Sequence, residues 1–158
     1  MQLILKGIDR INKAITWGVI LMFGVMAIVI IAQVIYRFVL KASLPWSEEL
    51  ARYLMVWVTF LGAGVAVRTK GLIAVEAIVN LLPSAVKKAI YYLVTLLSVG
   101  LIVIMIYFGF KMTGFVSNQL SAAMQISMAW AYSAIPVGAI VMLMNTVAVI
   151  IEEKGGQP

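Results

Sequence analysis

A long uncharged run near the start of the chain sets its environment. Residues Ala14 to Tyr36 contain no charged side chain. In an α-helix, which rises 1.5 Å per residue, this run spans roughly 34 Å and is long enough to cross a bilayer. A secretory signal peptide also joins a basic start to an apolar run, but its apolar part is shorter. The run therefore predicts a first membrane-spanning helix over residues 14–36.

The composition agrees with a chain solvated mainly by lipid. Of the 158 residues, 64% are hydrophobic and 11% are charged. A soluble domain usually has about 45–50% apolar and about 25% charged residues. Because a small soluble protein must cover itself with polar surface, burial in a core does not account for this excess. A lipid-facing surface does.

Two residue types are absent, and their absence excludes several kinds of chemistry. The chain has no Cys and therefore no disulfide, thiolate metal site or thiol catalysis. It has no His, the commonest metal ligand and general base. No catalytic, substrate-binding or metal site and no cofactor is expected. The net charge of +6 comes from basic residues in short groups between apolar runs, so nucleic acid is not an expected partner.

Three further spans follow from the remaining apolar runs. Only Tyr53 to Val67 is uninterrupted in the second, so that helix must begin near Ser47, just after Pro45, to cross a bilayer. The predicted spans are 14–36, 47–67, 87–111 and 128–151. Residues 1–13 and 71–82 are too short to cross and are expected to form amphipathic helices on the membrane surface. The sequence thus predicts one all-α integral membrane domain with four transmembrane helices, short interfacial helices and a tail, 152–158.

Basic residues indicate the orientation of the spans. Three lie before the first span, four lie between the second and third spans, and one lies in the tail. The other four of the 12 lie on the opposite side. Since basic residues are concentrated in cytoplasmic segments, both termini are predicted to face the cytoplasm.

One polar cluster stands out between the first two spans. Glu48 and Arg52 are four residues apart and can pair on one helix face. The cluster is either a surface that docks a partner protein or an ordinary interfacial anchor with basic side chains reaching headgroups. Its members are Arg37, Trp46, Glu48, Glu49, Arg52 and Tyr53.

A group of small residues follows on the second span. Small side chains allow two helices to approach closely in a membrane. Packing within this chain and packing against a partner chain both fit the pattern. The group consists of Gly62, Ala63, Gly64 and Ala66.

These features resemble the small, DctQ-type membrane subunit of tripartite ATP-independent periplasmic (TRAP) transporters. The resemblance covers nearly the whole chain in order, size and helix number, and its most specific part is the segment Trp46 to Tyr53. The matching residues are Gln33-Val34-x-x-Arg37, Trp46-Ser47-Glu48-Glu49-Leu50-Ala51-Arg52-Tyr53, Trp57, Phe60-Leu61-Gly62-Ala63, Arg68 and Pro136-Val137-Gly138. Three residues depart from the family pattern. Gln33 stands where Asn is frequent, Leu72 where His is common, and Glu76 where Asp is frequent.

The resemblance implies a three-part system in a bacterial inner membrane. A periplasmic protein captures an organic acid, such as sialic acid or a C4-dicarboxylate, and a large many-helix subunit carries it across with sodium. The small subunit is expected to brace the large one and to help dock the periplasmic protein. Sodium is expected to bind the large partner, not this chain.

Two other function classes compete with this interpretation. A membrane enzyme would need an acid cluster or a nucleophile–base pair at membrane depth, and the sequence has neither. An independent transporter or channel, acting as a homo-oligomer, would usually need an ionisable group within its spans. The first, third and fourth spans have none in their centres.

Overall fold

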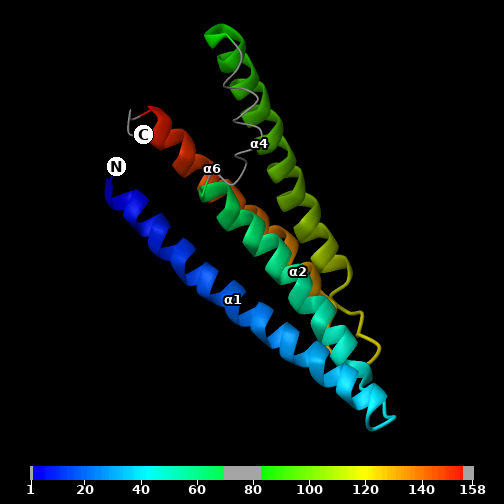
Figure 1. Cartoon of the computed structure of the whole chain (residues 1–158). Coiled ribbons are helices and arrows are strands. Elements are labelled where there is room, and N and C mark those ends of the chain that lie inside the picture. The colour runs from blue at the N-terminus through cyan, green and yellow to red at the C-terminus, as the bar shows by residue number, and fades with distance from the viewer. Residues whose placement is uncertain (1, 70–82, 155–158) are drawn as a thin grey trace.

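The structure, a computed structural model, describes residues 2–69 and 83–154. Within these ranges the chain forms helices and no strand, which confirms the all-α class. Figure 1 shows the start of α1 and the end of α6 at the same end of the molecule. The helices are α1 (Gln2–Phe38), α2 (Pro45–Arg68), α4 (Ser84–Phe115), α5 (Ala129–Tyr132) and α6 (Ala134–Lys154).

Four segments of the described chain are long and apolar enough to cross a membrane. They are Leu5–Phe38, Pro45–Arg68, Ala89–Phe115 and Ala129–Glu152. Large apolar side chains cover their outer surfaces, as a lipid solvent requires. A membrane fold with four spans is therefore confirmed.

The amino-terminal segment differs from the separate surface helix that was expected. α1 continues without a break from Gln2 through the whole first span. Leu5 and Asn12 are buried, so the first turns of α1 belong to the helix bundle. An apolar run marks the part of a helix that lipid covers, whereas the helix itself continues while its polar residues find partners. The expected helix at 71–82 lies outside the described residues.

The fourth span is divided between α5 and α6. The break precedes Pro136, which has no N–H to donate to the carbonyl of Tyr132 and whose ring would clash with it. The backbone N–H of Val137 donates to the Ser133 carbonyl at 3.2 Å, and the helix continues from there. Pro136 thus divides an apolar run that otherwise reads as one helix.

α2 lies between α1 and α6, and it approaches α6 closely at two glycines. A Cβ on Gly138 of α6 would lie 2.6 Å from the Cβ of Phe60. A Cβ on Gly64 of α2 would lie 2.7 Å from Cγ1 of Val141. Both distances are too short for a real methyl group, so each glycine allows a backbone approach that alanine would prevent.

α4 joins this three-helix core mainly through its carboxyl-terminal half. A Cβ on Gly109 would lie 2.9 Å from Cδ of Pro136, which marks the close crossing with α6. The amino-terminal half of α4 leans away from the other helices (Figure 1). Leu93, Leu96 and Leu97 in that half are 56%, 71% and 64% exposed.

Candidate functional site

Polar side chains gather at the two ends of the bundle. We call the end formed by the start of α1 and the ends of α2 and α6 the terminal end. The loop end is formed by residues 39–44, between α1 and α2, and by the α4–α5 loop, residues 116–128. The terminal end and the loop end each contain a network of hydrogen bonds that joins separate helices.

Arg68 organises the terminal end. Its Nε donates to Oδ1 of Asp9 at 3.0 Å, and its two terminal nitrogens donate to the two carboxylate oxygens of Glu152. The Arg68 side chain is 14% exposed, so these contacts are partly shielded from solvent. Paired N–H donors facing both carboxylate oxygens form the strongest common geometry for an ion pair. Arg68 therefore joins α2 to both α1 and α6.

A buried amide pair lies beside this ion-pair network. Nδ2 of Asn12 donates to Oδ1 of Asn145 at 2.7 Å, and Nδ2 of Asn145 donates to Oδ1 of Asn12 at 2.8 Å. Nδ2 of Asn145 also donates to the Gly64 carbonyl at 2.7 Å. The relative exposures of Asn12 and Asn145 are 6% and 0%. One side chain of α6 thus binds both α1 and α2.

Glu49 organises the loop end. One of its carboxylate oxygens accepts a hydrogen bond from the Tyr53 hydroxyl at 2.9 Å. The other oxygen accepts from the backbone N–H groups of Ala123 and Met124, at 3.0 and 2.8 Å. Hydrogen bonds to a carboxylate are stronger than those between neutral groups. Glu49, a member of the polar cluster noted in the sequence, thus holds the α4–α5 loop against α2, and Tyr53 binds the same carboxylate.

The α4–α5 loop is ordered by further contacts of its own. Leu120 and Ser127 form an isolated antiparallel bridge, and the buried Ser121 donates its backbone N–H to the Ile126 carbonyl. Nε1 of Trp57 donates to the Trp130 carbonyl just beyond the loop. The polar residues of this connection therefore form a compact cap on the loop end.

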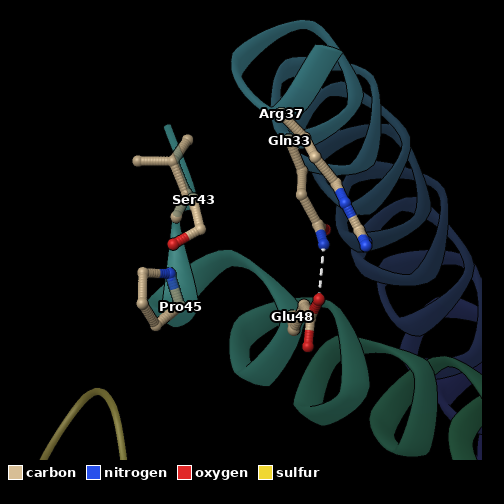
Figure 2. Close-up of a pocket in the computed structure, with 6 residues that line it drawn as sticks. Gln33, Arg37, Ser43, Pro45 and Glu48 are labelled. Atoms are coloured by element: carbon tan, nitrogen blue, oxygen red, sulfur yellow. Dashed lines mark hydrogen bonds between the residues drawn. The ribbon is translucent and has the colours of Figure 1, made fainter. Parts of the chain in front are cut away.

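Glu48 takes a different partner from the one that its spacing indicated. Nε2 of Gln33 on α1 donates to Oε1 of Glu48 at 2.9 Å (Figure 2). Within residues 2–69 and 83–154, no ion pair joins Glu48 to Arg52 or to Arg37. The carboxylate of Glu48 therefore joins α1 to α2 instead of pairing along its own helix.

The other predicted residues divide between the surface and the interior. Arg52 is exposed, and Trp46 is 44% exposed. Of the small residues, Gly64 packs against α6, whereas Ala63 and Ala66 are exposed. Gly64 therefore packs within the chain, whereas Ala63 and Ala66 remain open to packing against a partner chain.

The network at the terminal end was not predicted from the sequence. Asp9, Asn12 and Glu152 lie near the ends of apolar runs, where polar residues are ordinary. A contact between helices could have been predicted at Asn145, because a lone Asn within an apolar span needs a hydrogen-bond partner on another helix. Its partners are distant in the sequence and were visible only in the structure.

In the described part of the chain, four apolar helices carry charged networks near their ends, which defines a multi-pass integral membrane protein. A family model described as "Tripartite ATP-independent periplasmic transporters, DctQ component" matches residues 26–154. The chain therefore belongs to the DctQ family of TRAP transporter components.

Known transporter proteins share parts of this sequence. The chain is 37% identical over 136 residues to the sialic acid TRAP transporter permease protein SiaT of Haemophilus influenzae (strain 86-028NP). It is 32% identical over 71 residues to the isethionate TRAP transporter permease protein DctMQ of Oleidesulfovibrio alaskensis. These matches cover 85% and 40% of this chain, but only 22% and 11% of the respective relatives.

Proposed function

We propose that this chain is a non-transporting subunit that braces the large, many-helix subunit of a TRAP transporter in a bacterial inner membrane. The observation that carries the proposal is the placement of its charges. The ion pairs and the Glu49 network lie at the two ends, and residues 14–36, 54–67 and 89–110 contain no charged side chain. Ion-coupled transport within a membrane usually needs an ionisable group at depth, so the large subunit is the component that binds sodium and substrate.

The internal contacts suit a bracing role. Arg68 and Asn145 join α1, α2 and α6 at the terminal end. Glu48 and Glu49 join α2 to α1 and to the α4–α5 loop at the other end. A core joined at both ends resists relative movement of its helices and offers a fixed surface to a moving partner.

The exposed face of α2 is the surface that we assign to the large subunit. Met55 is 60% exposed, and the exposed residues that follow at helical spacing are Thr59, Ala63 and Ala66. Their side chains become small toward the end of α2, which allows a partner helix to approach closely.

Docking of a periplasmic substrate-binding protein is assigned to the loop end. With both termini in the cytoplasm, the α4–α5 loop faces the periplasm. Exposed Trp46 and Arg52 lie in the first turns of α2, where Glu49 binds this loop, and Leu120 at 60% exposure stands on the loop itself. An aromatic ring, an Arg and an apolar side chain are typical anchors of a protein interface.

The proposed cargo is a small organic anion. The SiaT relative is named for sialic acid and the DctMQ relative for isethionate. Because the match to SiaT covers more of this chain, sialic acid is the first compound to test.

Reconstitution into proteoliposomes tests this function directly. Sodium-driven sialic acid uptake is expected only when this chain, the large subunit and the binding protein are combined. Uptake by this chain alone would instead identify an independent homo-oligomeric transporter and overturn the proposal.

A pair of variants tests the assigned face. Ala63→Leu with Ala66→Leu places bulk in a close helix contact, which costs about 1–3 kcal/mol and weakens association by about 5-fold to 150-fold. Ala14→Leu makes the same change at an exposed position of α1 and serves as the control. Co-purification of the large subunit at wild-type levels with the α2 double variant would contradict this assignment.

A further inference from the structure

A polar pocket lies at the loop end, between the last turns of α1 and the first turn of α2. Its volume is about 380 Å³. Figure 2 shows Gln33 and Arg37 extending from α1 toward Glu48, with Ser43 and Pro45 on the opposite side. The lining residues are Gln33, Arg37, Ser43, Leu44, Pro45 and Glu48.

The pocket presents one positive and one negative group that do not neutralise each other. The Arg37 guanidinium has no ion-pair or hydrogen-bond partner among residues 2–69 and 83–154. Glu48 uses one carboxylate oxygen to accept from Gln33, and its other oxygen has no partner in the same ranges. A matching ligand would carry an anion for Arg37 and a hydrogen-bonding cation for Glu48.

Exposed apolar side chains lie near this charged pair along the chain. Val34 is 50% exposed, Phe38 is 74% exposed and Leu40 is 58% exposed. Trp46, an aromatic residue of the kind enriched where headgroups meet hydrocarbon, stands at the start of α2 with 44% exposure. The ligand would therefore also have an apolar part that continues along α1 into the bilayer.

We infer that this pocket binds the headgroup of a phospholipid with a primary ammonium, such as phosphatidylethanolamine. The phosphate lies at the Arg37 guanidinium, and the ammonium donates to the open carboxylate oxygen of Glu48. The acyl chains follow the apolar side chains of α1. The inference needs only the membrane fold and is independent of the proposed transport role.

Phosphatidylethanolamine differs from two related lipids in ways that the pocket should detect. Phosphatidylcholine has the same charges, but its quaternary ammonium has no N–H to donate to Glu48. Phosphatidylglycerol has the phosphate and lacks the cation. Since a hydrogen bond to a charged group is stronger than one between neutral groups, we expect phosphatidylethanolamine to bind about tenfold more tightly than phosphatidylcholine.

Native mass spectrometry of the full chain, purified in detergent and titrated with each of the three lipids, measures these preferences. Glu48→Gln keeps the size of the side chain and should abolish the preference for phosphatidylethanolamine over phosphatidylcholine. Arg37→Gln should weaken binding of all three lipids. Lys111→Gln changes an exposed charge on α4 and should leave all three affinities unchanged.

Because Arg37 and Glu48 are exposed, both variants should insert and fold, which circular dichroism and size-exclusion chromatography verify. Equal binding of the three lipids by the wild-type chain would overturn the inference. So would a lipid preference that survives Glu48→Gln. Loss of a co-purifying protein in both variants, with no lipid selectivity in the wild type, would instead assign the pocket to a protein partner.

Discussion

Asn145→Ala is expected to lower the free energy of unfolding by about 3 kcal/mol. The variant loses three hydrogen bonds between helices, two in the pair with Asn12 and one to the Gly64 carbonyl. Such bonds contribute about 0.6 kcal/mol each within a membrane, which gives about 2 kcal/mol. The buried Oδ1 of Asn12 is also left without its donor, which costs about 1 kcal/mol more.

A double-mutant cycle separates the amide pair from other effects. Asn12→Ala removes the two bonds of the pair and should cost about 2 kcal/mol, including the amide left unpaired. The double variant should also lose only about 2 kcal/mol, because no buried amide remains without a partner. The double change is therefore expected to be less harmful than Asn145→Ala alone.

Reversible unfolding in mixed micelles, driven by sodium dodecyl sulfate and followed by circular dichroism, provides the measurement. Asn118→Ala changes an exposed loop amide and should stay within about 0.5 kcal/mol of wild type. If the two single effects add to the double effect within about 0.5 kcal/mol, the amides do not bind each other and the reasoning fails.

Two further comparisons use matched positions. Gly138→Ala places a methyl group 2.6 Å from the Cβ of Phe60 and should destabilise the protein by about 1–3 kcal/mol, whereas Gly100→Ala meets nothing within 4 Å and should stabilise it by about 1 kcal/mol. The same micelle assay measures both, and changes of equal sign would contradict the close crossing of α2 and α6. Glu49→Ala should speed hydrogen exchange of the loop amides that it holds by about tenfold or more, whereas the neighbouring Glu48→Ala should not. Unchanged exchange in Glu49→Ala would refute its role in ordering the loop.

The spans were predictable because lipid imposes a minimum length on an apolar run. Helix ends were less predictable, since the end of such a run is where the lipid contact stops and not where the helix stops. α1 begins at Gln2, well before Ala14, because Asp9 and Asn12 find partners on α2 and α6. Pro136 divided the last span at a point that hydropathy alone does not mark.

At the loop end, the spacing of residues along one helix did not predict which contacts form. Glu48 and Arg52 have the spacing of a helical ion pair, but Glu48 accepts from Gln33 on another helix. Glu49 lies near the membrane edge, where an unpaired carboxylate is costly, and two backbone N–H groups of a distant loop donate to it. Local spacing limits which residues can meet on one helix, whereas tertiary packing decides which contacts form.

The contacts between α1 and α2 at both ends also determine how the protein adapts to hydrophobic mismatch. Asp9 meets Arg68 at one end and Gln33 meets Glu48 at the other, and roughly 36 Å of α1 separates the two contacts. A slide of one helix past the other by a single turn, about 5.4 Å, would break both contacts at once. In a thinner membrane these helices must therefore tilt together, and any chain packed against them would experience the change in tilt as a rotation of one rigid surface.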